Sequence, residues 1–268
     1  MNIVVLIKQV PDTYSERRLR ESDGTLDRDA TDAVLDEINE RAVEAALQLK
    51  EAHGGADSTV TVLTMGPDRA TDAIRKALSM GADKAVHLSD EALAGSDSVQ
   101  TAKALATTIG ATVGAPGEGF DLVLAGNEAS DGRGGAVPAM VADRLGLPAL
   151  THAREIVVDG STVRVKRETD DGVTHLTAEL PAVVSVGEKI NEPRYPSFKG
   201  IMAAKKKPVQ TVALADVGID PSAVGLANAL STVTSAAPKP PKSAGEKVTD
   251  EGDGGVRIAS FLAAQKLI

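Results

Sequence analysis

A glycine-rich segment in the middle of the chain is the clearest candidate for ligand chemistry. Residues 126–138 read GNEASDGRGGAVP, with four glycines in thirteen residues, and lead into a stretch with helical periodicity. Backbone amides in such a loop can approach a phosphate closely, and the N-terminus of the next helix adds a favourable field. The dinucleotide pattern G-x-G-x-x-G is incomplete because Val137 holds its last position, and no P-loop pattern occurs. The segment predicts either a phosphate-binding loop or an ordinary surface loop that enters a helix.

A second segment, Asn191–Lys207, has the composition of a protein-docking surface and is called the docking segment below. It reads NEPRYPSFKGIMAAKKK and holds two of the five aromatic residues of the chain, Tyr195 and Phe198. Its prolines and Gly200 predict an irregular loop with a restricted backbone. Counted from Glu188 to Lys207, the chain carries six Lys or Arg against two Glu here, so about +4 in a chain of net charge −9. Such a segment predicts either an anchor for an acidic partner or a solvated turn whose two rings pack into the core.

Familiar catalytic groupings are absent from the sequence. Without cysteine, the chain has no disulfide, thiolate nucleophile, Cys-ligated metal or iron–sulfur cluster. The four histidines lie apart, none paired at the spacing of metal ligands: His53, His87, His152 and His175. Carboxylates are plentiful, but no pattern selects a general acid–base pair. We therefore expect no catalytic residue and no metal site, and a module that holds a nucleotide and docks rather than an enzyme acting alone.

Composition limits the classes of partner. The 268 residues are 42% hydrophobic, enough for a substantial core, yet no apolar run approaches the ~20 residues that span a bilayer. The first ten residues, MNIVVLIKQV, predict a buried strand rather than a signal peptide. A pI near 5.0 argues against nucleic-acid binding, because phosphates would be repelled. We expect a soluble, cytoplasmic protein that does not span a membrane.

The elements that must position these segments alternate along the first two-thirds of the chain. Four apolar runs predict buried strands: Ile3–Ile7, Thr59–Thr64, Lys84–Leu88 and Leu122–Ala125. Four amphipathic stretches predict helices: Ile38–Ala52, Ala70–Met80, Ser98–Gly110 and Gly134–Leu145. This alternation predicts an α/β fold with an open, mostly parallel, Rossmann-like sheet covered on both faces. Ligands of such sheets bind beyond the carboxyl ends of the strands, where Lys8–Tyr14, Met65–Asp68 and residues 126–138 would meet.

The pattern changes after Pro148. Three strands separated by Asp-Gly turns predict an antiparallel hairpin extension: Ile156–Val158, Val163–Thr169 and Val173–Leu180. Ala182–Val186 predicts a return to the core sheet. We therefore expect one nucleotide-binding α/β domain over residues 1–207, which includes the docking segment.

Residues 208–268 are expected to form an extended C-terminal arm. The composition of Ala236–Glu246 (AAPKPPKSAGE) predicts a linker. Gly255–Ile268 predicts a short helix with Ile258, Phe261 and Leu262 on one face. That helix either packs back on its own domain or contacts a partner, and the Pro-rich tether favours the partner.

Several motifs occur together in a familiar order. They are VLIKQV at residues 5–10 with Pro11-Asp12, NERAVEAALQL at 39–49, Met65-Gly66-Pro67, ALSMGAD at 77–83, LVLAGNEASD at 122–131, PAVV at 181–184, and the docking segment. In this order and spacing, over residues 1–207, the chain resembles the beta subunit of electron-transfer flavoproteins.

The resemblance implies a heterodimer in which an alpha subunit holds most of an FAD. The beta subunit, with an adenine-nucleotide-hydrolase-like fold, would bind AMP structurally and present the flavin without turnover of its own. Electrons would come from acyl-CoA and related dehydrogenases of fatty acid oxidation and pass to a membrane quinone oxidoreductase. The AMP positions that carry over are Leu6, Asp36, Glu37, Ile38, Asn39, Met65, Gly126, Asp131, Gly132, Arg133, Gly134, Gly135, Ala136 and Val137.

The resemblance also implies a flavin-proximal and a docking set. Tyr14 and Ile38 would approach the flavin from the beta side. The docking positions are Arg194, Tyr195, Pro196, Phe198, Lys205, Lys206 and Lys207, with Phe198 as the anchor where leucine is usual in the family.

The chain departs from the family pattern in the glycine-rich segment. Many relatives have Gln where Glu128 stands and polar residues where Gly135, Ala136 and Val137 stand, so phosphate contacts would rest on backbone amides and Arg133. Two alternatives stay open: a bifurcating flavoprotein with a second FAD in this subunit, and a universal-stress-type ATP-binding homodimer.

Overall fold

The computed structural model describes residues 1–54, 57–237, 240–242, 245 and 247–268. The chain forms two compact units, Met1–Thr234 and Ser235–Ile268, which we describe separately. Among the described residues, no helix is both long and apolar enough to cross a bilayer.

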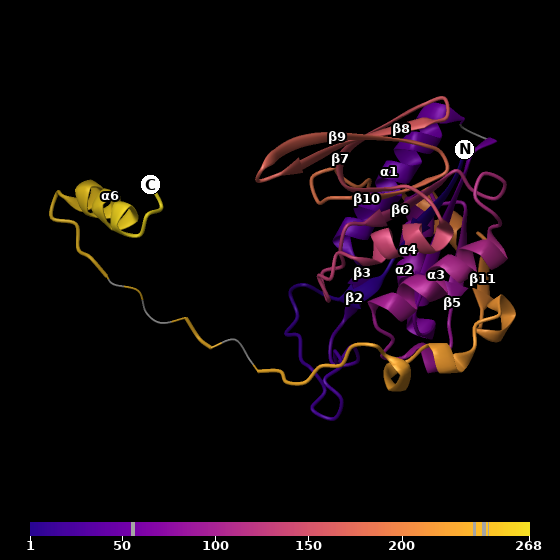
Figure 1. The fold of residues 1–268 in the computed structure, drawn as a ribbon, viewed down its shortest axis with the longest axis horizontal. Coiled ribbons are helices and arrows are strands. Elements are labelled where there is room, and N and C mark those ends of the chain that lie inside the picture. The colour runs from indigo at the N-terminus through magenta and orange to yellow at the C-terminus, as the bar shows by residue number, and fades with distance from the viewer. Residues whose placement is uncertain (55–56, 238–239, 243–244, 246) are drawn as a thin grey trace. The chain divides into compact units, whose positions relative to one another are not determined.

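The first unit is built on a nine-stranded sheet (Figure 1). Its strand order is β11-β5-β4-β1-β6-β10-β7-β8-β9. The strands are β1 (Asn2–Leu6), β4 (Thr59–Met65), β5 (Lys84–Leu88), β6 (Leu122–Gly126), β7 (Ala149–Asp159), β8 (Thr162–Thr169), β9 (Gly172–Glu179), β10 (Ala182–Val186) and β11 (Val209–Val212). All neighbours pair in parallel except β7–β8 and β8–β9. The predicted open, mostly parallel sheet with an antiparallel extension is confirmed.

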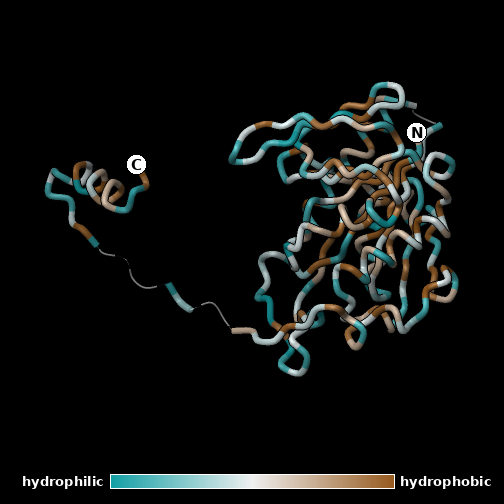
Figure 2. The backbone as a smooth tube through the Cα atoms, in the orientation of Figure 1, coloured by the Kyte–Doolittle hydropathy of each residue, from teal (hydrophilic) through white to brown (hydrophobic). Residues whose placement is uncertain are grey.

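Two layers of helices bury the sheet. Helices α1 (Glu37–His53) and α2 (Thr71–Met80) pack on the face that includes Ile3 and Val5. Helices α3 (Ser98–Thr112) and α4 (Val137–Leu145) pack on the opposite face, with Val4 and Leu6. Because both faces are covered, the central strands are apolar at nearly every position. Figure 2 shows these hydrophobic strands at the centre of the first unit.

The predicted helix Gly134–Leu145 is too long at its start. Helix α4 begins at Val137, and Gly135 has a φ of 63°, outside the helical region. Gly134 and Gly135 therefore belong to the glycine-rich segment, which becomes a loop that runs up to the helix N-terminus.

We expected an irregular loop in the docking segment from its prolines and Gly200. The structure instead contains a short helix there. Residues Phe198–Ala204 form helix α5, which starts after Ser197, and the Ser197 hydroxyl accepts a hydrogen bond from the amide of Gly200 at 3.0 Å. A Cβ at Gly200 would lie 2.5 Å from the carbonyl oxygen of Ser79 on α2. The glycine is thus used for close packing of α5 on α2 rather than for a loop.

The domain boundary also differs from the expected position at residue 207. Strand β11 pairs with β5 and extends the sheet, and Leu214, Val217 and Val224 are buried in the core beyond it. The first unit consequently continues to Thr234. A small antiparallel sheet of β2 (Gln9–Pro11) and β3 (Ala33–Leu35), which we did not predict, encloses an excursion over residues 12–32.

The second unit contains helix α6 (Gly254–Ala264), close to the predicted amphipathic stretch. No residue of this helix is buried, and its Val256, Ile258 and Phe261 side chains are exposed. The expected linker over residues 236–246 lies in part outside the described residues.

Candidate functional site

The carboxyl ends of three neighbouring strands bring the predicted ligand segments together. Strand β1 lies between β4 and β6, so the loops that follow Leu6, Met65 and Gly126 meet at one edge of the sheet. Asn127 extends this contact, since its amide donates to the carbonyl oxygen of Val186 at 2.8 Å. The topology thus places the glycine-rich loop at the edge where open parallel sheets bind ligands.

Asp36 joins this loop to helix α1. It is fully buried and caps the helix: its Oδ1 accepts from the amides of Ile38 at 3.0 Å and Asn39 at 3.2 Å. Its Oδ2 accepts from the amide of Ser130 at 2.7 Å. The two elements also touch at Gly126, where a Cβ would lie 2.5 Å from Asn39 Nδ2. The start of α1 and the start of the loop therefore form one tightly packed floor.

Asp131 is the electrostatic centre of the loop. Its side chain is 1% exposed and pairs with Lys8 Nζ at 2.9 Å and with Arg28 Nη2 at 2.6 Å. Burial alone would raise the pKa of this carboxyl, but the two cations outweigh it and the pKa lies below its ordinary value. Arg17 Nη1 donates to the neighbouring carbonyl oxygen of Ser130 at 2.5 Å. Three cations therefore face two carboxylates, Asp131 and the buried Asp36 that also contacts Ser130, and the remaining positive charge suits an anion.

The second half of the loop is open. A Cβ at Gly132 would meet no atom within 4 Å, and those at Gly134 and Gly135 would meet one each, at 4.0 and 3.9 Å. In the described chain the amides of Gly134, Gly135 and Ala136 donate to no backbone or side-chain acceptor, and α4 has no side-chain cap. The buried Ser130 Oγ and Asn127 Oδ1 also lack partners there. Free amides beside an uncapped helix N-terminus and a cationic cluster fit a phosphate group.

The predicted AMP residues divide into a buried and an exposed set. Leu6, Asp36, Ile38, Asn39 and Gly126 are buried and shape the floor, whereas Glu37, Gly132, Arg133 and Gly134 are exposed; Met65, Asp131, Gly135, Ala136 and Val137 are intermediate. Arg133, with a φ of 48°, carries a largely exposed side chain 3.9 Å from Glu128. The loop thus offers main-chain donors, as expected from its composition.

Of the two predicted flavin-proximal residues, only one is exposed. Tyr14 is 97% exposed on the turn after β2, whereas Ile38 is buried against Gly126.

The sequence reading missed Arg17 and Arg28, and it did not identify Lys8 as the partner of Asp131. Lys8 and Asp131 are 123 positions apart, so their pairing could not be read from the sequence. The charged residues between positions 12 and 32 show no pattern that indicates which arginines reach the glycine-rich loop.

The docking segment presents its apolar side chains outward. Tyr195 is 95% and Phe198 80% exposed, and Ile201 and Met202 on the same helix are about half exposed. The alternative in which the two rings pack into the core is wrong. Pro196 is half-buried at the turn into α5.

The cations of the docking segment play different parts. Lys205 and Lys206 are exposed. Lys207 instead donates from Nζ to the carbonyl oxygens of Leu78 at 2.9 Å and Ala82 at 2.6 Å, at the end of α2. Arg194 pairs with Glu44 and Glu51 on α1. The charge offered to a partner therefore comes from Lys199, Lys205 and Lys206.

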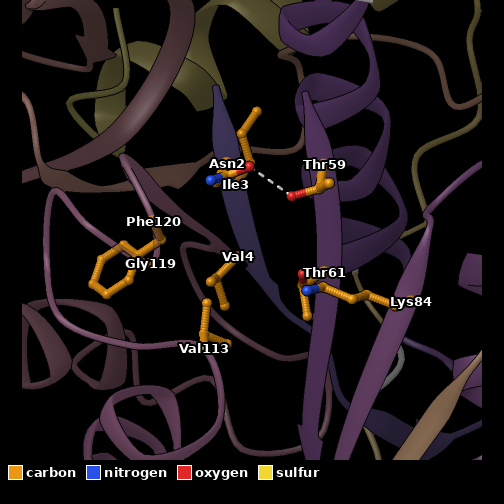
Figure 3. A pocket seen from close by; sticks show the side chains of 9 residues that line it. All are labelled: Asn2, Ile3, Val4, Thr59, Thr61, Lys84, Val113, Gly119 and Phe120. Atoms are coloured by element: carbon orange, nitrogen blue, oxygen red, sulfur yellow. Dashed lines mark hydrogen bonds between the residues drawn. The ribbon is translucent and has the colours of Figure 1, made fainter. Parts of the chain in front are cut away.

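A separate cavity of about 220 Å³ lies at the opposite edge of the sheet (Figure 3). It is lined at the amino ends of β1, β4 and β5 by Asn2, Thr59, Thr61 and Lys84, with Val113 and Phe120 across from them. Thr59 Oγ1 donates to Asn2 Oδ1 at 2.7 Å. Since α3 ends beside Val113 and helix C-termini repel anions, this cavity does not suit a phosphate.

No three His, Asp or Glu side chains among the described residues are grouped to hold a metal ion. His87, the buried histidine, has its Nε2 3.0 Å from the carbonyl oxygen of Gly66, as a structural residue would.

Comparison with known proteins connects this geometry to a family. A family model described as "Electron transfer flavoprotein domain" matches residues 23–217. The electron transfer flavoprotein subunit beta of Mycobacterium tuberculosis is 64% identical over 269 residues, covering 100% of this chain and 99% of that protein. The same subunit of Megasphaera elsdenii is 37% identical over 273 residues, with 100% of both chains covered. An Acetobacterium woodii protein named caffeyl-CoA reductase-Etf complex subunit CarD is 36% identical over 249 residues, covering 93% of this chain and 92% of that protein.

These matches extend through the sheet, the glycine-rich loop and the docking segment. The chain therefore belongs to the electron transfer flavoprotein family, as a beta subunit.

Proposed function

We propose that this beta subunit pairs with an alpha subunit that holds most of an FAD, and that it binds AMP as a structural ligand. The pair accepts electrons from acyl-CoA and related dehydrogenases and passes them to a membrane quinone oxidoreductase, in the cytoplasm, as part of fatty acid oxidation. The observation that carries the proposal is the exposure of two rings on a well-packed segment: Tyr195, just before α5, and Phe198, its first residue. The subunit itself performs no turnover.

The glycine-rich loop supports the AMP part of the proposal. The free amides of Gly134, Gly135 and Ala136 would hold the phosphate, and the excess charge of Lys8, Arg17 and Arg28 over Asp36 and Asp131 would favour it. Such a ligand joins the loop to α1 and so stabilises the edge of the sheet. We assign it a structural role because the contacts expected for it are main-chain amides.

FAD, when bound, supplies the electron-accepting chemistry. This chain supplies a base for it and a surface through which a dehydrogenase approaches. Exposed Tyr14, on the turn after β2, is the residue we assign to the flavin side.

The docking face is suited to a brief encounter. Burying one phenylalanine side chain stabilises a complex by roughly 1.5–3 kcal/mol, which is enough to orient a partner and too little to retain it. Lys199, Lys205 and Lys206 are exposed around the same helix and attract an acidic surface. Electron-transfer complexes are typically of this small, short-lived kind.

The test is Phe198→Ala in the heterodimer purified from its own host. We expect the KM for the flavoprotein in dehydrogenase-driven reduction to rise about tenfold, because the lost burial is worth about 1.4 kcal/mol or more. Flavin content should be unchanged. Val173→Ala, an exposed apolar residue on β9, is the control and should leave the KM unaltered. Loss of flavin in Phe198→Ala would show instead that the segment belongs to the cofactor site.

A second FAD in this subunit is the alternative that one observation favours. The loop leaves open space above Gly132, Gly134 and Gly135, where bulkier side chains would crowd a larger ligand. Denaturing the purified heterodimer and measuring the released nucleotides separates the two: one FAD and one AMP per pair supports the main proposal, and two FAD without AMP supports bifurcation. ATP released from a homodimer would contradict both.

A further inference from the structure

The docking segment is fixed to helix α1 by one arginine. Arg194 Nε and Nη2 donate to the two carboxylate oxygens of Glu44, at 2.7 and 3.0 Å. The backbone amide of Arg194 donates to the same Glu44 carboxylate at 3.1 Å. Its Nη1 and Nη2 also reach Glu51 about two turns further along the helix, at 2.6 and 3.2 Å. Both the main chain and the side chain of Arg194 are thus directed into α1.

Glu44 makes this contact hard to replace. Its side chain is 5% exposed, so the carboxylate depends on Arg194 and on Gln48 Nε2, which donates at 3.0 Å. Removing the guanidinium would leave a buried charge with two neutral donors, the amide of residue 194 and Gln48 Nε2, and with no cation to pair it. Only a planar guanidinium can meet two carboxylates about two turns apart with several hydrogen bonds at once, and a lysine ammonium cannot.

The remainder of the segment is fixed by contacts on both sides of Arg194. Asn191 Nδ2 donates to the carbonyl oxygen of Arg41 at 3.0 Å, and the Arg41 guanidinium donates back to the carbonyl oxygen of Asn191. At the far end Arg75 Nη1 donates to the carbonyl oxygen of Ala204 at 2.7 Å. Between these points Tyr195 and Phe198 face solvent.

We propose that Arg194 is a positioning residue for partner docking: it does not contact the dehydrogenase but holds the backbone from which Phe198 projects. The proposal rests on the docking role of α5 given above. It replaces our expectation that Arg194 contributes a cation to the partner surface, because the guanidinium is already paired with two carboxylates of α1. A fixed segment loses less conformational freedom when Phe198 is buried, so the arginine acts on the affinity of the encounter and not on electron transfer within it.

The experiment uses the native heterodimer with Arg194→Gln, Arg194→Lys and the pair Arg194→Gln/Glu44→Gln. The control is Arg154→Gln, which removes the same charge from an exposed ion pair with Glu168 at 3.8 Å. Three quantities are measured: the KM and kcat for dehydrogenase-driven reduction, hydrogen exchange of residues 195–204 in the free heterodimer, and the melting temperature.

We expect Arg194→Gln to raise the KM about tenfold with kcat within about twofold, and to speed exchange of residues 195–204 but not of β10. Arg194→Lys should give a KM and an exchange rate between those of the native protein and of Arg194→Gln. If the glutamine variant does not fold, the lysine variant is used for the test. The double variant removes the unpaired buried charge, so it should recover the melting temperature while its KM stays high. Arg154→Gln should change none of the three.

Two results would overturn the positioning role. A raised KM with unchanged exchange would mean that Arg194 touches the partner directly. A KM that recovers together with the melting temperature would mean that the arginine matters only for stability. Measuring Phe198→Ala in parallel separates the role of Arg194 from the docking proposal. An unchanged KM in Phe198→Ala would contradict docking through α5. A raised KM in Phe198→Ala together with an unchanged KM in Arg194→Gln would contradict only the role of Arg194.

Discussion

Gly126 shows how one residue joins the sheet to the candidate nucleotide site. Gly126 is the last residue of β6. An ideal Cβ at this position would lie 2.5 Å from Asn39 Nδ2, 3.0 Å from Ile38 Cγ2 and 3.2 Å from the carbonyl oxygen of Glu128. The side chains of Ile38 and Asn39 are themselves buried in the first turn of α1, so they have little room to move aside. A methyl group here must shift the Asn39 amide and press on the first turn of α1.

We therefore predict that Gly126→Ala lowers the free energy of unfolding by roughly 1–3 kcal/mol, the usual range for overpacking a dense core. AMP content should fall with it, because α1 and the loop no longer meet. Urea unfolding of the heterodimer and nucleotide analysis after denaturation measure the two effects. Gly110→Ala is the control: it lies within α3 with no atom near its Cβ position, so it should stabilise by about 0.5–1 kcal/mol. Unaltered stability in Gly126→Ala would contradict the close contact.

At the scale of elements, the excursion over residues 12–32 is held to the glycine-rich loop by charge. Arg28 reaches Asp131, and Arg17 reaches the carbonyl oxygen of Ser130. Asp29 on the same excursion pairs with Arg69 at 2.9 Å. The shape of the loop therefore depends on the ionisation of Asp131, whose pKa is lowered by Lys8 and Arg28 against the opposing effect of burial.

The sign of the pH dependence follows from that lowered pKa. The stabilisation by Asp131 is fully present above the ordinary aspartate pKa and is lost as the pH falls through the lower folded-state pKa. We predict that Asp131→Asn lowers the free energy of unfolding by roughly 1–3 kcal/mol at pH 7 and by progressively less as the pH falls below the ordinary aspartate pKa. Urea unfolding across this pH range measures it, with exposed Asp143→Asn as the control. An equal loss at both ends of the range would show that the charge of Asp131 is not what holds the excursion.

Elements supported by their own sequence could be predicted, and elements supported by distant contacts could not. β5 and β10 are apolar runs that read as buried strands without further information, and both occur as expected. α5 has seven residues with a glycine inside, so its stability comes from packing on α2, which local propensity does not reveal. The Arg194–Glu44 pair spans 150 positions, and nothing in either residue's neighbourhood indicates it. The sequence could thus draw attention to the segment that exposes Tyr195 and Phe198, whereas the contacts that hold this segment could not be predicted.

At the scale of the whole molecule, the first unit has a core, whereas the described residues of the second unit include none that is buried. Residues up to Thr234 bury two clusters on the faces of the sheet, whereas α6 buries none of its residues. A helix of eleven residues is marginal by itself in water, because nucleation costs more than so few hydrogen bonds return. The apolar side chains of Val256, Ile258 and Phe261 therefore need a surface to cover them, and we propose that the alpha subunit provides it.

A chain that ends at Ala236 tests this arm. We predict that its heterodimer dissociates at least about tenfold more readily, since covering even one large apolar side chain contributes 1.5 kcal/mol or so. The free energy of unfolding of the first unit should be unchanged, because the arm lies outside it. Analytical ultracentrifugation over a dilution series measures the dissociation constant. In the full-length chain, Ile258→Asp/Phe261→Asp should reproduce the loss, whereas Arg257→Gln, which alters an exposed pair with Asp253 on the same helix, should not. An unaltered dissociation constant in the truncated chain would mean that α6 serves no contact with the alpha subunit.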